Sequence, residues 1–430
     1  MGNMKIRNRN LIETIDDINK VIYPLFIWDD NDNFIHLDDY DTYIYFGSIG
    51  ACVTGRNSKN TYEDFVLQLY EQPQFQYIHI RELEKLVITI VKHIHDDGIE
   101  KSKNDCGIAK EWDFFTKGSL KDFEVIRPVW GISFKKGTSE ITLGPFCIMK
   151  SSEVQGKVNK SSNRSLRQRT DEFLERYPYL IAVHILAKSE NRALELATPY
   201  FALFDDFFKF LFHDVPSMDG GVYKFANPKL DEAIVLWDND KIKISGKRSG
   251  AHRPISEEWF REYKIINEAF DIIDKFKEGR ATDLEQRIIR AIHYVGLANA
   301  ESDKAVIYSL YMVAVEALLQ SNAENGMVSP SITYQISEAA AFIISAYRSK
   351  DCSEKNKTEM RKSIFQDFKA LYNNRSRIVH GNIVNVNVRE LKEEQELVYE
   401  LINDTIALVH DKKYSGLKEI HEWINDLRFS

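Results

Sequence analysis

A short stretch near the C-terminal end of the chain carries the side chains best suited to chemistry. It reads LYNNRSRIVHGN, residues 371–382, and holds Arg375, Arg377 and His380 among several amides. A histidine exchanges a proton readily near neutral pH, and a guanidinium offers phosphate oxygens fixed, charged donors. Together they suffice to cleave a phosphodiester without metal. The histidine takes the proton of a ribose 2′-hydroxyl or protonates the leaving 5′-oxygen, and the arginine stabilises the charge of the phosphorane.

The same cluster also has a purely structural interpretation. Cationic side chains at the C-terminus of a helix interact favourably with its free carbonyls, and Gly381 suits a C-terminal cap because glycine accepts a positive φ. His380 would then lie in the last turn. An arginine and a histidine form a weak motif by themselves, so the residue types leave both interpretations open.

Spacing decides which side chains could work together on one straight helix. Ser376 and Arg377 precede His380 by four and three positions, so either can meet it on one face. Arg375 precedes it by five, which places the two side chains on different sides. Cooperation between Arg375 and His380 would require a break in the helix, an arginine that reaches around it, or a second subunit. The sequence does not decide whether Arg375 or Arg377 serves His380.

Apolar residues at intervals of three and four predict the helix that carries this stretch, over residues 359–375. The expected buried stripe consists of Ile364, Phe365, Phe368 and either Leu371 or Tyr372, continued by Ile378 and Val379. Asn373 and Asn374 could bind substrate or cap the preceding turn.

A carboxylate in the apolar run VAVEALL, Glu316, is the other notable residue. A buried carboxylate needs a partner, so we expect an ion pair with Arg375 or Arg377. Such a pair could be structural, and it could also position a catalytic arginine.

The composition limits the class of protein. The 430 residues carry a net charge of −8, which argues against nucleic-acid binding over a broad surface and favours a local, recessed contact. Four widely spaced cysteines without a CxxC pair fit a reducing cytosol. No signal peptide is visible, and the longest apolar run is too short to cross a bilayer. We therefore expect a cytoplasmic protein that does not enter a membrane.

The pattern of apolar and polar residues along the chain predicts an α+β fold in three parts. Residues 1–115 form a mixed α/β region, residues 116–252 an α+β region with an antiparallel sheet, and residues 255–430 an all-α helical bundle. Between two strands, residues 157–169 carry five basic and no acidic side chains. They are expected to form a solvated loop, or one that touches phosphates.

Beyond the residue types, RSRIVHG resembles the R-x4-6-H signature of HEPN domains, with Arg375 and His380 at its ends. The segments YMVAVEALLQ, SITYQISEAAAFII and FKALYNNRSRIVHGN resemble the Apea-like HEPN family, and the resemblance covers about residues 255–410. It implies a dimerising helical bundle in which two such motifs form one composite, metal-independent ribonuclease site. Arg375 would bind the phosphate, and His380 would be the acid or base. Ser376 stands where Asn, Asp or His is frequent, so its role is open.

The sequence thus predicts a metal-independent HEPN endoribonuclease, an abortive-infection effector against phage whose N-terminal region controls it. Arg375 and His380 are the expected catalytic residues, supported by Ser376, Glu316, Arg377 and Asn374. The expected partners are RNA, with tRNA as one candidate, a second copy or higher oligomer of the chain, and a phage-derived trigger; no cofactor or metal is expected. The alternative is a non-catalytic HEPN module that dimerises or binds nucleotide or RNA, or a toxin–antitoxin partner. The acidic net charge and Ser376 favour it.

Overall fold

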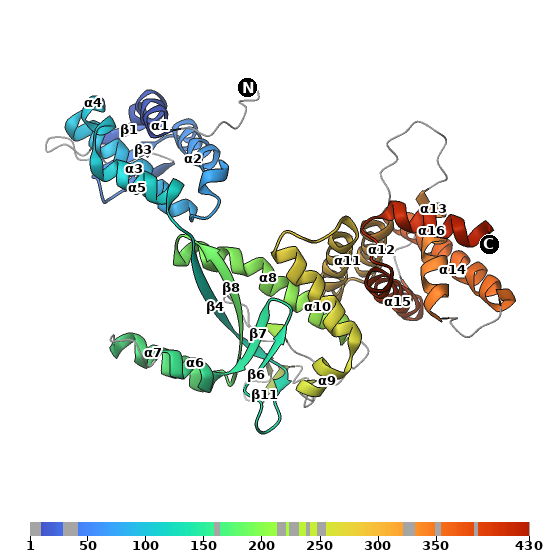
Figure 1. Ribbon diagram of the computed structural model, residues 1–430. Coiled ribbons are helices and arrows are strands. Elements are labelled where there is room, and N and C mark those ends of the chain that lie inside the picture. The colour runs from blue at the N-terminus through green and yellow to red at the C-terminus, as the bar shows by residue number, and fades with distance from the viewer. Residues whose placement is uncertain are drawn as a thin grey trace. The chain divides into compact units, whose positions relative to one another are not determined.

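The computed structural model describes residues 10–28, 42–158, 164–212, 221–222, 232–237, 241–246, 255–320, 332–348, 354–381 and 386–429. Its fold is mixed α+β, as predicted, with a predominantly helical C-terminal region (Figure 1). The chain forms two compact units, Met1–Val125 with His184–Thr198, and Ile126–Val183 with Pro199–Ser430. The division into three domains stays a prediction. Within the described ranges, no helix combines the length and the apolar character needed to cross a membrane.

The first unit packs helices around a small antiparallel sheet. The sheet has the order β1-β3-β2 and is formed by β1 (Phe26–Trp28), β2 (Tyr43–Phe46) and β3 (Ala51–Thr54). Its core includes Phe75, which is fully buried against Trp112. The helical segments are α1 (Leu11–Asp17), η1 (Ile18–Ile22), η2 (Tyr23–Leu25), α2 (Arg56–Tyr70), η4 (Pro73–Phe75), α3 (Ile80–Asp97), α4 (Ile99–Lys103) and α5 (Cys106–Lys117).

A five-stranded sheet follows, in the order β6-β7-β8-β4-β9. Its strands are β4 (Lys121–Trp130), β6 (Glu140–Leu143), β7 (Phe146–Lys150), β8 (Tyr179–Ala187) and β9 (Gly221–Val222). Alternating burial along β6 and the antiparallel pairing of β6, β7 and β8 agree with the predicted antiparallel sheet. Short pairs are formed by β5 (Ile132–Ser133) with β12 (Ile255–Ser256), and by β10 (Glu232–Trp237) with β11 (Lys241–Gly246).

The basic stretch at residues 157–169 is only in part a connection between elements. Helix α6 (Ser151–Val158) ends inside it, and helix α7 begins at Arg164 and runs to Arg176. The expectation of a loop is therefore wrong for residues 164–169, where the apolar Leu166 and the later Phe173 and Leu174 fit a helical repeat. Residues 159–163 lie outside the described part of the chain.

Phenylalanines of α8 (Glu190–Leu211) form the core that joins the sheet to the first helix of the bundle. Phe204 contacts Phe146 of β7 at 5.3 Å and Phe270 of α10 (Lys264–Lys277) at 5.7 Å between ring centroids. All three are fully buried. The bundle is thus built onto the sheet within one unit.

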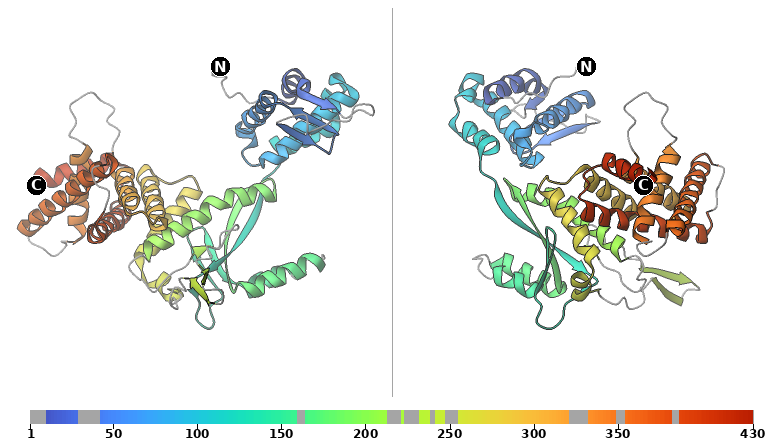
Figure 2. Two further views of the ribbon diagram at one scale, coloured as in Figure 1. Left: turned by 180° about the vertical axis from the view of Figure 1, so that it is seen from behind. Right: turned by 45° about the vertical axis from the view of Figure 1, so that its right-hand side comes forward.

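The helices of the bundle lie between residues 257 and 429 (Figures 1 and 2). Helix α12 packs against α11, α14 and α15, and α13 packs against α14. Side-chain caps fix the start of three of these helices, with Thr282 before α11, Asp303 before α12 and Asn387 before α15. Besides α10, the helices are α9 (Glu257–Glu262), α11 (Asp283–Ala300), α12 (Lys304–Leu319), α13 (Ile332–Arg348), α14 (Glu354–Val379), α15 (Val388–Lys412) and α16 (Leu417–Phe429).

Candidate functional site

Helix α14 carries the polar stretch and runs without a break through it. It extends from Glu354 to Val379, and the His380 N–H still donates to the Ser376 carbonyl at 3.0 Å. Gly381 follows with φ of 74°, a left-handed conformation that ends the helix. The predicted glycine cap is therefore confirmed. The break that could have brought Arg375 toward His380 within one chain does not occur.

The buried face of α14 follows the predicted stripe through most of its length. Ile364, Phe368 and Leu371 are buried, and Phe365 packs edge-on against Tyr334 of α13. The expectation that Val379 continues this face is wrong, because its side chain is 56% exposed. The last turn of α14 thus presents an apolar side chain beside His380.

Glu316 of α12 faces Arg375 of α14. Their nearest atoms, Oε2 and Nη2, lie 3.7 Å apart, with 17% of the Glu316 side chain and 28% of the Arg375 side chain exposed. At this distance the two charged groups form an ion pair, but they are too far apart for a hydrogen bond. The structure therefore pairs Glu316 with Arg375, the first of the two arginines considered from the sequence.

The Arg375 guanidinium retains donor capacity beside this carboxylate. Its Nε atom is buried and has no hydrogen-bond partner among the described residues. A buried donor without a partner costs about 1–3 kcal/mol, and a charged donor costs more. Because part of the Arg375 side chain is exposed, other N–H groups of the guanidinium can donate to a phosphate oxygen.

Tyr372, one turn before Arg375, completes the surroundings of the carboxylate. Its side chain interacts with Glu316. Burial raises the pKa of the Tyr372 phenol, the Glu316 charge raises it further, and the Arg375 charge acts in the opposite direction. Glu316 therefore interacts with both the Tyr372 phenol and the Arg375 guanidinium. The apolar repeat of α14 predicts only a packing role for Tyr372.

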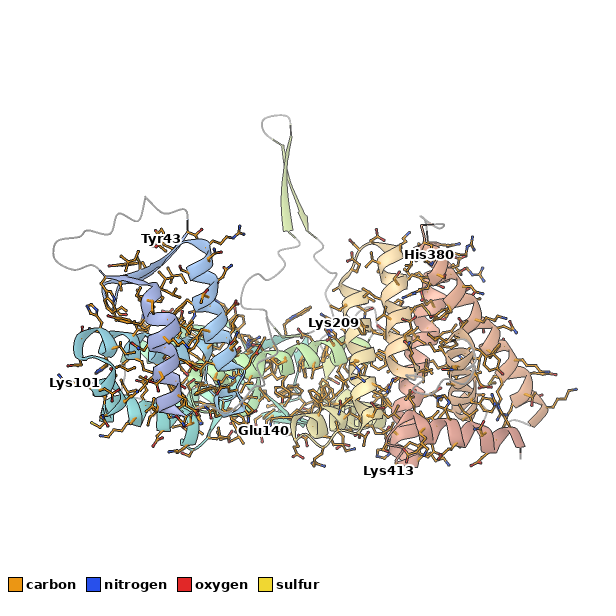
Figure 3. The ribbon with its side chains drawn as sticks, turned by 90° about the horizontal axis from the view of Figure 1, so that it is seen from above. Tyr43, Lys101, Glu140, Lys209, His380 and Lys413 are labelled. Carbon is orange, nitrogen blue, oxygen red and sulfur yellow. The ribbon has the colours of Figure 1, made fainter. Side chains whose placement is uncertain are left out.

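The remaining predicted residues lie at the solvent-facing end of the helix. His380 and Arg377 are exposed, and Ser376 is half-buried. Figure 3 shows His380 at the rim of the bundle. No ion pair or hydrogen bond joins the side chains of Arg375 and His380 within the described residues. One chain therefore holds the two expected catalytic groups apart.

Asn374 is half-buried, and its side chain interacts with the phenol of Tyr308 on α12. The Tyr308 hydroxyl donates to the Leu371 carbonyl at 3.2 Å. Asn373 is exposed. Because α14 continues past both asparagines, neither caps the end of a turn. Tyr308, absent from the predicted site, anchors the turn that carries Arg375.

A buried acid lies beneath this turn. Glu394 of α15 is fully buried, and neither of its carboxyl oxygens has a hydrogen-bond partner in the described part of the chain. Burial raises the pKa of Glu394 well above its ordinary value. Tyr308 and Tyr311 of α12 lie close enough to Glu394 for a charge on its carboxylate to raise the pKa of their phenols. Burial thus favours the protonated form of Glu394, beside the tyrosines of α12.

A metal ion has no evident protein ligands in the described residues. No group of three or more His, Cys, Asp or Glu side chains is arranged there to hold one. At the end of α3, His93 Nδ1 lies 3.9 Å from Asp97 Oδ2.

Comparisons with known proteins identify no relative of this chain. No family model, no curated protein and no solved structure matches it. A function must therefore be inferred from the residues of α12 and α14.

Proposed function

We propose that the protein is a metal-independent endoribonuclease of the HEPN type, with Arg375 and His380 as its catalytic residues. The main support is the state of the Arg375 guanidinium. It forms an ion pair with Glu316 at 3.7 Å, and the buried Nε atom of Arg375 has no hydrogen-bond partner among the described residues. Such a guanidinium is oriented and still able to bind a phosphate. His380, exposed at the end of the same helix, is accessible to an RNA substrate as acid or base.

The proposed active unit is a homodimer. Arg375 and His380 lie on different sides of an unbroken helix, so one chain does not bring them to one phosphate. Two-fold symmetry would place the arginine of one copy beside the histidine of the other. The exposed side chains of Val379 and Val388, 56% and 62% accessible, flank His380 in the sequence and give this end of the bundle an apolar surface that a second copy could cover.

In this role the protein acts in abortive infection. It cleaves host or phage RNA, with tRNA among the candidate targets, once a phage-derived trigger releases the control exerted by residues 1–115. Control is needed because an unrestrained ribonuclease would kill its host. The cytoplasm is the expected compartment, since the substrate is there.

The first test is growth of host cells after induction of the full chain, with and without phage, and total RNA resolved on a gel. His380→Ala and Arg375→Ala should each abolish growth arrest and RNA cleavage, with losses of about 100-fold or more in cleavage rate. Arg377→Ala should reduce cleavage less than Arg375→Ala does, because Arg377 is exposed and Glu316 does not hold it. Equal behaviour of wild type and all variants in infected cells would contradict the proposal.

The second candidate is a non-catalytic HEPN module that binds nucleotide or RNA, or serves as a toxin–antitoxin partner. The separation of Arg375 and His380 within one chain favours it, as does the net charge of −8. Purified protein that binds RNA without cutting it, in the presence of infected-cell extract, would support this alternative.

A further inference from the structure

The solvent-facing side of α14 forms a continuous cationic stripe that leads to His380. Its members recur at intervals of three and four, so they share one face of the helix. All of them are exposed, and they are Lys362, Gln366, Lys369, Asn373, Arg377 and His380. We call this set the α14 stripe. No acidic residue belongs to it. The nearest acid on this side is Glu359, one turn before its start.

The cations of the α14 stripe differ from three exposed cations on two other helices of the bundle. On α15 and α16, Arg389, Lys392 and Lys418 each pair with a glutamate four residues later, at 2.9, 3.7 and 3.8 Å. Lys362 and Lys369 have Gln366 and Asn373 at that position. An amide can accept and donate hydrogen bonds but does not neutralise a lysine.

No acidic side chain of the described residues forms an ion pair with Lys362, Lys369 or Arg377. In a chain with a net charge of −8, a face with three unpaired cations and no acid is a local exception. Its charge complements a polyanion.

We propose that the α14 stripe binds the backbone of single-stranded RNA on one side of the scissile phosphate. This inference rests on the proposed function, because it takes His380 as the point of cleavage. Lys362 and His380 are eighteen positions apart, which is about 27 Å along a helix that rises about 1.5 Å per residue. At about 3.4 Å per stacked nucleotide, the stripe spans roughly eight nucleotides.

The chemistry favours a single strand over a duplex. Attack by a 2′-oxygen requires it to line up with the leaving 5′-oxygen, and an A-form duplex holds the ribose away from that alignment. The amides of Gln366 and Asn373 lie between the cations of the stripe. They can hydrogen-bond unpaired base edges or 2′-hydroxyls, which a single strand leaves accessible.

The test measures binding of a fluorescent 12-nucleotide single-stranded RNA to the full chain with His380→Ala, which prevents cleavage, over a series of salt concentrations. Each phosphate contact contributes about 0.7 to the slope of log affinity against log salt. Adding Lys362→Gln and Lys369→Gln should therefore reduce the slope by about 1.4. Affinity at about 0.1 M salt should fall about 25-fold, since each lost contact removes a factor of about five.

The matched control removes two lysines that have acidic partners, Lys392→Gln with Lys418→Gln, so the net charge of the two proteins is equal. The control should keep the slope of the parent. Equal slopes and affinities for the α14 pair and the control pair would overturn the inference, and so would failure of the parent to bind the 12-mer.

Cleavage separates this inference from the proposed function. In chains with His380 intact, the α14 double variant should raise KM for the 12-mer and leave cleavage of a dinucleotide unchanged, because a dinucleotide does not reach Lys369. If the wild-type chain binds the 12-mer with the predicted slope but cuts no RNA, the proposed nuclease activity is refuted, while RNA binding by the α14 stripe stands. If the chain cuts RNA and the double variant has an unaltered KM, the nuclease activity stands, while RNA binding by the α14 stripe is refuted.

Discussion

The Glu316 carboxylate of α12 lies 3.7 Å from the Arg375 guanidinium of α14, and the Tyr372 phenol interacts with the same carboxylate. Both members of the ion pair are partly exposed, so water screens their attraction and the pair adds little to stability. Its greater effect is geometric. It fixes the direction of a guanidinium whose long side chain would otherwise sample many rotamers.

Glu316→Gln tests this positioning. The glutamine keeps the shape and loses the charge, so we expect RNA cleavage to slow by about tenfold, which corresponds to about 1.4 kcal/mol of transition-state stabilisation. The free energy of unfolding should change by less than about 1 kcal/mol. The measurements are single-turnover cleavage and urea unfolding. The control is Glu400→Gln, which removes the acid of another interhelical pair, Arg348–Glu400. A similar loss of cleavage in both variants would refute a specific role of Glu316.

Residue patterns were sufficient to predict the parts of this region that depend on one helix at a time. The apolar repeat predicted most of the buried face of α14. The position of the Glu316 carboxylate inside the apolar run of α12 predicted that it has a charged partner. The exposure of Val379 was not predictable, because it depends on where the neighbouring helices stop covering α14. Tyr308 and Glu394 were missed for a related reason, since their importance arises from the packing of three helices that are distant in the sequence.

Tyr308→Phe tests the anchor beneath the Arg375 turn. The change removes the hydroxyl that donates to the Leu371 carbonyl at 3.2 Å and leaves a buried acceptor with one bond fewer. We expect a loss of about 1 kcal/mol in the free energy of unfolding, measured as a lower midpoint in urea. Tyr334→Phe is the control, because that side chain is 44% exposed and its hydroxyl bonds Glu338 on the surface. Unchanged stability of Tyr308→Phe would show that this hydrogen bond is dispensable.

Glu394→Gln tests the buried carboxylic acid through pH. Burial raises the pKa of Glu394 in the folded chain, whereas an unfolded chain has the ordinary value of about 4.3. Above that value the unfolded state has released a proton that the folded state still binds, so the stability of the wild type falls as pH rises toward the folded pKa. Glutamine cannot ionise, so the variant does not lose this stability as pH rises. The variant should therefore gain stability relative to wild type as pH increases.

Urea unfolding of both proteins between about pH 4 and pH 8.5 measures this difference. The exposed neighbour Glu393 supplies the control, since Glu393→Gln should follow the pH dependence of the wild type. If the curves for Glu394→Gln and wild type stay parallel over this range, the carboxyl of Glu394 is ionised in the folded protein.

Control by the N-terminal region is tested without truncation. A fragment that starts at residue 255 would expose Phe270, which is buried against Phe204. Phe75→Ala instead weakens the first unit in the full chain, because Phe75 is fully buried against Trp112, and should cost about 3–5 kcal/mol. If residues 1–115 restrain the nuclease, this variant should arrest growth more strongly than wild type in uninfected cells. Adding His380→Ala should abolish the effect, and growth arrest that persists there has another cause.

The composite site predicts complementation between two inactive proteins. In a dimer of Arg375→Ala with His380→Ala, the first chain keeps its histidine and the second keeps its arginine. If the two groups act across the dimer, the mixture should recover RNA cleavage after subunit exchange. Random pairing makes half of the dimers mixed. Each mixed dimer holds one arginine and one histidine from opposite chains, so activity should stay below that of the wild type.

The control mixes His380→Ala with His380→Gln, in which no dimer holds a histidine, and it should remain inactive. Placing Val379→Lys in both complementing chains should then remove the recovered activity, because a charge beside His380 opposes apolar contact between copies. Val379 is exposed in the single chain, so its substitution should leave the helical content of each chain unchanged. Recovery that fails while both proteins dimerise would mean that Arg375 and His380 act within one chain, which the helix could permit only if the arginine side chain reached around it.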